Sequence, residues 1–291
     1  MRNVLFYFAV PICVLLHGHG AAKAEVITIV AAENVYADIA KQIGAEHVAV
    51  ISILSNPNQD PHLFEVSPSV AREIGAAGLT ISNGIGYDPW MEKLISASPS
   101  GNRQHIVVAD VAGLQDGANP HLWYDLSIIN KFAATLAEKL VALDPSNAET
   151  YHQNQQRFEE SLVPISSRIA QIAAAKKSTP VAATEPVFGY MLAAMGLDVK
   201  EQAFQLAVMN DTEPAISDVA TFEKDIKTKA VELLVFNGQA KSPLSEKMLA
   251  LATANGIAVV EVTETEPPGT NFQSWMKKEV EATAKALGVT L

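Results

Sequence analysis

The sequence has almost no cysteine: Cys13 is the only one in 291 residues. It lies in the apolar run VLFYFAVPICVLL, which a lone arginine precedes and an Ala-Lys-Ala motif follows at residues 22–24. These features predict a secretory signal peptide over residues 1–24, cleaved before Glu25. The mature chain then has no disulfides and no thiolate ligands, so any metal site in it must use His, Asp and Glu side chains.

The sequence also lacks an apolar run long enough for a membrane anchor at its start. The run contains 13 residues, whereas a helix needs roughly 20 to span a bilayer. A lipid anchor on Cys13 is disfavoured, because Ile12 stands where a lipoprotein signal has a small residue. We therefore expect a secreted, periplasmic protein.

Basic residues are scarce compared with acidic ones. The chain has 21 Lys and Arg against 32 Asp and Glu, a formal net charge of −11. Loss of Arg2 and Lys23 with the signal peptide makes the mature charge more negative by two, −13. Because nucleic-acid binding depends on Lys and Arg that neutralise phosphates, this balance argues against a nucleic-acid partner.

Short β-rich runs alternate with helical stretches through most of the chain. From residue 25 the runs are VITIV, VAVISIL, LTIS and HIVVAD, and the pattern restarts with PVAAT, ELLVF and IAVVEV. Helices are expected near residues 187–195, 215–228, 244–255 and 271–287. Such alternation is typical of a parallel sheet wrapped by helices. The sequence predicts an N-terminal α/β lobe over residues 25–143 and a C-terminal α/β lobe over residues 177–291.

One long helix is expected to join the two lobes. Between residues 144 and 176 the apolar residues recur at spacings of three, four and seven, which places them on one helix face; they are Tyr151, Phe158, Leu162, Ile165, Ile169 and Ile172. A helix from about 145 to 175 would be roughly 46 Å long. Pro164 is expected to kink it.

The N-terminal lobe contains the same small turn twice. DPHLFEVSP at residues 60–68 and NPHLWYDLS at residues 119–127 each place proline directly before a histidine, His62 and His121. Both turns follow a predicted strand, at the sheet edge where open α/β folds bind ligands. Proline restricts the backbone, so each imidazole lies on a stiff turn. The alternatives are chance, or turns that only cap helices at Ser67 and Asp125.

Carboxylates occupy the matching edge of the C-terminal lobe. Glu185 directly follows the predicted strand PVAAT, and Glu264 follows IAVVEV. Each could instead be a solvated loop acid or a charge near a helix N-terminus. Two histidines from one lobe and carboxylates from the other form a set of ligands suited to a first-row transition metal.

These residues together resemble the cluster A-I solute-binding proteins, the periplasmic metal-binding components of ABC transporters that import zinc or manganese. The resemblance extends over the mature chain, through QDPHLFEVSPS, NPHLWYDLS, ATEPVFGYMLAAMGL and the long helix. It implies two lobes joined by that helix and one bound Zn or Mn ion. It also implies the metal ligands His62, His121, Glu185 and Glu264.

The chain departs from the family pattern at three places. Glu185 stands where zinc-binding members often have histidine, and the loop before His121 lacks their His-rich insertion. The fourth position is commonly aspartate, so Glu266 or water could replace Glu264. For orienting the His121 imidazole, Asn119 and Asp125 are both candidates. Asn237 is a further candidate for supporting the site.

The function expected from this resemblance is non-catalytic: a monomer that captures one divalent metal and delivers it to an ABC permease in the inner membrane. A secreted zinc metallohydrolase is the alternative, since two histidines, a glutamate and another acid also describe a catalytic zinc site. The chain has no H-E-x-x-H motif and no nucleophile motif, which disfavours that enzyme class. A surface adhesin is a third class that the signal sequence does not favour.

Overall fold

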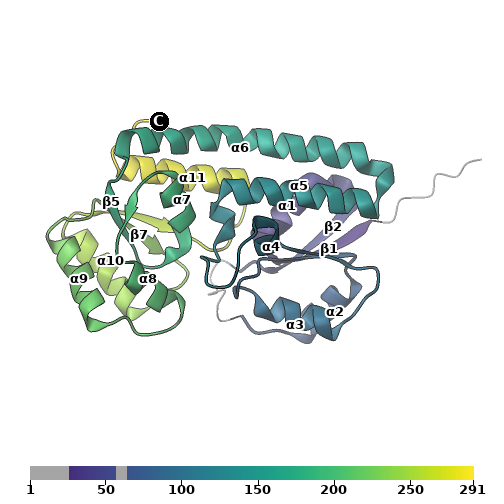
Figure 1. Ribbon diagram of the computed structural model, residues 1–291, viewed down its shortest axis with the longest axis horizontal. Coiled ribbons are helices and arrows are strands. Elements are labelled where there is room, and N and C mark those ends of the chain that lie inside the picture. Colours follow the sequence, from purple (N-terminus) through teal and green to yellow (C-terminus); the bar gives the residue numbers. More distant parts are fainter. Residues whose placement is uncertain (1–25, 57–63) are drawn as a thin grey trace, which may run out of the picture.

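The computed structural model describes residues 26–56 and 64–291, so the predicted signal peptide lies outside the described residues. Two lobes lie side by side beneath one long helix, α6 (Figure 1). Each lobe contains a four-stranded parallel sheet in the described part of the chain. The predicted fold class, two α/β lobes joined by a long helix, is confirmed.

The N-terminal sheet has the strand order β2-β1-β3-β4. Its strands are β1 (Ile27–Glu33), β2 (Val48–Leu54), β3 (Leu79–Ser82) and β4 (Gln104–Val107). Its helices are α1 (Asn34–Gly44), α2 (Pro68–Ala76), α3 (Pro89–Ala97), α4 (Val108–Ala112) and α5 (Leu126–Leu143). Strands β1 and β3 are almost fully buried, as expected for a parallel sheet covered by helices on both faces.

The C-terminal sheet repeats this topology in the order β6-β5-β7-β8. Its strands are β5 (Pro180–Ala183), β6 (Asp198–Val199), β7 (Leu233–Asn237) and β8 (Ala258–Val262). Its helices are α7 (Gly189–Ala194), α8 (Gln202–Met209), α9 (Ile216–Lys227), α10 (Pro243–Ala254) and α11 (Phe272–Ala286). Side-chain capping boxes begin α10 at Ser242 and α11 at Asn271.

One local expectation was wrong, and two elements were missed. The run HIVVAD, predicted as one strand, divides into β4 and α4, because short apolar runs do not distinguish a strand from a buried helical turn. Strand β6 and helix α8 were not predicted at all. Strand β6 has only two residues, too few for a periodic pattern.

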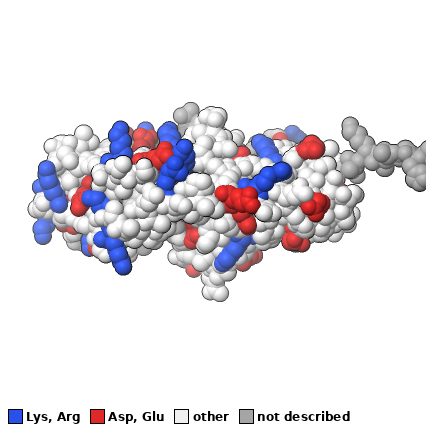
Figure 2. All heavy atoms as spheres, turned by 90° about the horizontal axis from the view of Figure 1, so that it is seen from above, with Lys and Arg blue, Asp and Glu red and all other residues white. Residues whose placement is uncertain are grey.

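Helix α6 (Ala148–Lys176) packs against α1 and α5 of the first lobe and against α11 of the second. The apolar residues predicted for one face are all buried: Tyr151, Phe158, Leu162, Ile165, Ile169 and Ile172. Pro164 lies inside the helix, which continues past it (Figure 1). Acidic and basic side chains are interspersed on the face that carries α6 and α11 (Figure 2), where Arg168 pairs with Glu281 at 3.1 Å.

Among the described helices, none combines the length and the apolar character that a bilayer span requires.

Neighbouring residues of α6 provide a test of this packing. Leu162 is 1% exposed and Val163 is 61% exposed. Leu162→Ala should lower the free energy of unfolding by about 2–5 kcal/mol, because it leaves a cavity in the core that joins the lobes. Val163→Ala, the matched control, should change it by no more than about 0.5 kcal/mol. Urea unfolding measures both, and equal losses would contradict the assigned buried face.

Candidate metal centre

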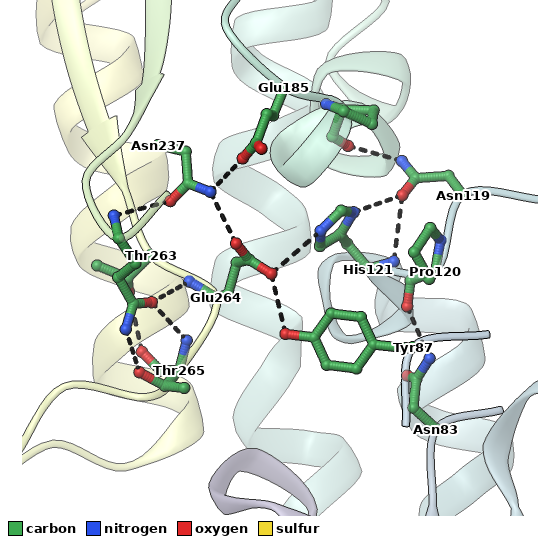
Figure 3. Close-up of polar contacts among 12 residues, drawn as sticks. Asn83, Tyr87, Asn119, Pro120, His121, Glu185, Asn237, Thr263, Glu264 and Thr265 are labelled. Carbon is green, nitrogen blue, oxygen red and sulfur yellow. Dashed lines mark hydrogen bonds and ion pairs between the residues drawn. The ribbon is translucent and has the colours of Figure 1, made fainter. Parts of the chain in front are cut away.

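Four polar side chains from the two lobes lie close together in the interior (Figure 3). His121 comes from the loop between α4 and α5, in the N-terminal lobe. Glu185 lies two residues beyond the end of β5, and Glu264 lies two residues beyond the end of β8. Asn237 is the last residue of β7. All four are buried, with His121 and Glu264 fully inaccessible. The carboxyl ends of the strands therefore place these polar groups in the interior between the lobes.

Asn119 sets the orientation of the His121 ring. Its Oδ1 accepts hydrogen bonds from the His121 backbone N–H at 3.1 Å and from Nδ1 at 2.6 Å. With the proton on Nδ1, the lone pair of a neutral ring is on Nε2. Nε2 faces Oε2 of Glu264 at 3.4 Å. Asp125, the other residue considered for this role, instead caps α5 by accepting from the backbone N–H groups of Ser127 and Ile128.

The amide of Asn237 connects the two carboxylates. Its Nδ2 donates to Oε1 of Glu264 at 2.7 Å and, in a short hydrogen bond, to Oε2 of Glu185. Its Oδ1 accepts from the backbone N–H of Gln239 at 3.0 Å, which orients the amide. Asn237, the further candidate for supporting the site, is therefore hydrogen bonded to both candidate ligands of the C-terminal lobe.

Glu264 also receives a donor from the opposite lobe. The hydroxyl of Tyr87 donates to Oε2 of Glu264 at 2.9 Å (Figure 3). Burial raises the pKa of Tyr87 well above its usual value, and the nearby carboxylates of Glu264 and Glu33 raise it further. Tyr87 thus remains a protonated donor. The aromatic rings of Tyr87 and Trp123 also contact the His121 ring edge to face, with centroids 5.9 and 5.5 Å away.

Gln239 holds the loop that carries Glu264. Its Oε1 accepts from the backbone N–H groups of Glu264 at 2.5 Å and Thr265 at 2.9 Å, and its Nε2 donates to Oγ1 of Thr265 at 2.7 Å. Sequence reasoning missed both Gln239 and Tyr87. Gln239 lies in the loop after β7, and Tyr87 lies in the loop after β3. A search for polar side chains in the loops that follow predicted strands could have found both.

Glu266, the alternative to Glu264, lies elsewhere. Its backbone N–H donates to Oδ1 of Asn34 at 2.9 Å, and Asn34 Nδ2 donates to its carbonyl at 2.8 Å. Burial, with the neighbouring Asp38 carboxylate, raises the pKa of Glu266 to about 8. Glu264, and not Glu266, contacts His121 and Asn237.

The predicted ligands are thus only partly placed by the structure. Asn237 contacts both Glu185 and Glu264, and Glu264 contacts His121, whereas His62 lies outside the described residues. Within residues 26–56 and 64–291, no group of three or more His, Cys, Asp and Glu side chains is arranged to hold a metal ion. The donor types alone, one imidazole nitrogen and two carboxylates, are those that transition metals bind in proteins.

Two further buried acids lie at the equivalent edge of the N-terminal sheet. Glu33 ends β1, and burial together with the Asp88 carboxylate raises its pKa well above the usual range. Asp88 has a pKa raised to about 6 by burial, although the backbone N–H groups of Gly84 and Asn83 oppose the shift. These acids are not part of the converging set.

Several hydrogen bonds join the lobes around this centre. Tyr124 donates to the carbonyl of Thr263 at 2.7 Å, and Asn119 Nδ2 donates to the carbonyl of Pro186 at 2.7 Å. Tyr190 donates to the carbonyl of Asn119 at 2.8 Å. These hydrogen bonds hold the loops of the two lobes together beside the centre.

Comparison with known proteins finds matches in one group. The family model ZnuA, described as zinc-uptake complex component A, periplasmic, matches residues 29–286. The manganese ABC transporter substrate-binding lipoprotein PsaA of Streptococcus anginosus is 26% identical over 306 residues, covering 98% of this chain and 97% of PsaA. The iron ABC transporter substrate-binding lipoprotein MtsA of Streptococcus pyogenes is 24% identical over 290 residues, covering 93% and 92%.

Solved structures share the fold. The periplasmic zinc-binding protein TroA of Treponema pallidum superposes with a TM-score of 0.75 at 20% identity, covering 90% of this chain and 99% of TroA. The solute-binding protein FpvC of Pseudomonas aeruginosa in complex with Mn²⁺ gives a TM-score of 0.75 at 20% identity, covering 91% and 99%. The named metals differ among these proteins.

Helix α11 of the C-terminal lobe contains a buried acid, Glu279. Its Oε1 accepts from the indole N–H of Trp275 at 2.7 Å. Burial raises the Glu279 pKa from 4.5 to about 8, and the neighbouring Tyr124 hydroxyl and Trp275 indole N–H oppose the shift. The folded protein therefore binds a proton at Glu279 that the unfolded chain releases near pH 4.5.

This linkage predicts a pH-dependent difference between variants. The raised pKa means that the stabilisation from Glu279 is complete below pH 4.5 and is lost as pH rises through 8. Glu279→Gln keeps a neutral acceptor, so its stability relative to wild type should improve between pH 5 and pH 8. Thermal unfolding at both pH values measures the difference. Glu281→Gln, at a partly exposed acid of the same helix, is the control and should show no such trend. An identical trend in both variants would contradict the assignment.

Proposed function

Because the chain belongs to the ZnuA family of periplasmic zinc-uptake components, we propose that it captures one divalent transition metal ion between its lobes and delivers it to an ABC permease. The named relatives are substrate-binding proteins of ABC transporters for manganese and iron. The family consists of transporter components rather than enzymes, and no comparison supports the metallohydrolase alternative.

One contact supports metal capture most directly. His121 Nε2 and Glu264 Oε2 face each other at 3.4 Å, with side chains 1% and 0% exposed. Since Asn119 holds the imidazole proton at Nδ1, these facing atoms are both acceptors when the ring is neutral. Two buried acceptors at this distance are stabilised by a positive charge between them, either a proton or a metal ion.

The proposed ligands are His121, Glu185 and Glu264, with His62 as the further ligand that the sequence indicates. Glu264 is preferred to Glu266 or water because it contacts both His121 and Asn237. We propose a periplasmic location after cleavage at Ala24, and a monomer that docks on a permease in the inner membrane. Zinc and manganese remain the two proposed substrates, because relatives with this fold are named for either metal.

Two glutamates on one loop provide a matched test of the ligand set. Glu264→Gln removes a buried charge from the centre and should lower zinc affinity by at least about 10–100-fold. His121→Ala and Glu185→Ala should cause comparable losses. Glu266→Gln should change affinity little, since this side chain lies beside Asp38. Calorimetric titration gives the affinities, and a larger loss for Glu266→Gln than for Glu264→Gln would reverse the assignment.

The ligand types also predict a metal order. Zinc should bind more tightly than manganese, because the Irving–Williams order favours zinc at sites of nitrogen and oxygen donors. Calcium should bind weakly, since it requires six to eight oxygen ligands. Competition calorimetry with zinc, manganese and calcium measures the order, and zinc should also raise the melting temperature by mass action. Tight calcium binding would show that the proposed ligand set is wrong.

A further inference from the structure

The C-terminal lobe contains a cavity of about 600 Å³ beside Glu185. It is lined by the α8–α9 loop, which includes Asp211 and Glu213, and by the β7–α10 loop, which includes Lys241. Volumes of about 300–1,000 Å³ are typical of sites for small organic molecules, and a bare metal ion needs far less. The metal ligands proposed above leave most of this space unexplained.

The topology places this cavity where ligands are expected. Strands β5 and β7 are neighbours in the order β6-β5-β7-β8. The chain leaving β5 continues to β6 at one edge of the sheet, whereas the chain leaving β7 continues to β8 at the other edge. The crevice beyond the carboxyl ends of such a strand pair is the usual ligand site of an open α/β sheet. Glu185 follows β5 and Lys241 follows β7, so the cavity lies in this crevice with Glu185 in its wall.

The two loops that line the cavity carry opposite charges: the α8–α9 loop has Asp211 and Glu213, and the β7–α10 loop has Lys241. Lys247, which also lines the cavity, pairs with Glu223 at 2.6 Å. Among the described residues, no ion pair involves Lys241, Asp211 or Glu213, and all three are exposed. Asp211 adopts the left-handed backbone region with φ of 51°, and its backbone N–H donates to the carbonyl of Val208 where α8 ends. A ligand carrying both an ammonium group and a carboxylate matches this separation of charge.

The remaining walls suit a short apolar segment. Val208, Met209 and Leu244 line the cavity and are partly buried. They offer contacts for the carbon atoms of a small molecule, while the charged loops select its ends. At the inner end, Glu185 is 4% exposed and hydrogen bonded to Asn237.

We propose that this cavity binds a free amino acid whose side chain ligates the metal held by Glu185, so that protein, metal and amino acid form a ternary complex. The inference rests on the proposed metal-binding function. Lys241 holds the carboxylate of the amino acid, Asp211 and Glu213 hold its ammonium group, and the side chain points toward Glu185. L-Histidine is the probe, because its imidazole adds a nitrogen donor where this chain has a carboxylate.

Native mass spectrometry and calorimetry test the proposal on the mature protein. Zinc and L-histidine together should give a complex with one zinc and one histidine. Histidine also chelates zinc in solution, so without a ternary complex the apparent zinc affinity falls along a calculable competition curve. If the ternary complex forms, the apparent zinc affinity should fall clearly less than this competition curve predicts. Imidazole, which lacks the charged end, and L-alanine, which lacks the donor, should form no ternary complex.

Two cavity variants locate the effect. Lys241→Glu should weaken histidine uptake into the ternary complex by about 10-fold, and Met209→Trp should abolish it by filling the cavity. Both should bind zinc alone as wild type does, which also shows that they are folded. Lys131→Glu, an exposed residue of α5, is the charge-matched control and should behave as wild type.

The outcomes separate this proposal from the function on which it rests. Zinc binding without a ternary complex, or a ternary complex unchanged by Lys241→Glu and Met209→Trp, would overturn the amino-acid site and leave the metal carrier intact. Failure of wild-type protein to bind zinc at all would overturn both.

Discussion

The centre of this protein depends on keeping two buried carboxylates stable between the lobes. Glu185 and Glu264 both accept from the amide of Asn237, and Tyr87 supplies a further donor to Glu264. A buried charge without such partners costs several kcal/mol. Because Tyr87 comes from one lobe and Asn237 from the other, satisfying Glu264 also holds the lobes together. Asn34 Nδ2 donates to the carbonyl of Glu266 and Tyr124 donates to the carbonyl of Thr263, and both bonds also hold the loop of Glu264 against the N-terminal lobe.

The repeated sheet topology explains why these groups meet. Each lobe ends its strands at the edge that faces the other lobe, and helix α6 maintains their separation through contacts with both. In the N-terminal lobe the corresponding crevice between β1 and β3 is filled by Glu33, Asn83 and Asp88, all buried. In the C-terminal lobe the crevice remains partly open beside Glu185. Equivalent topology thus gives a packed polar layer in one lobe and a cavity in the other.

Much of this arrangement could be predicted from the sequence, for physical reasons. The apolar spacing from Tyr151 to Ile172 depends only on helix geometry, and strand-following residues such as Glu185 share an edge in any parallel sheet. Tyr87 and Gln239 could not be ranked, because their roles depend on which side-chain atoms face Glu264 across the fold. The preference for Glu264 over Glu266 likewise required the structure, since the two residues have the same chemistry and differ only in what their loop contacts.

The donors that stabilise the carboxylates also bear on how a metal is released. An ion that binds Glu185 and Glu264 competes with the Asn237 amide for their oxygen atoms. When the ion leaves, that amide and the Tyr87 hydroxyl supply hydrogen bonds in its place, so neither Glu185 nor Glu264 remains buried without a donor. The affinity is therefore a difference between two satisfied states rather than the full strength of the metal bonds. A carrier that releases its metal to a permease requires a moderate affinity of this kind.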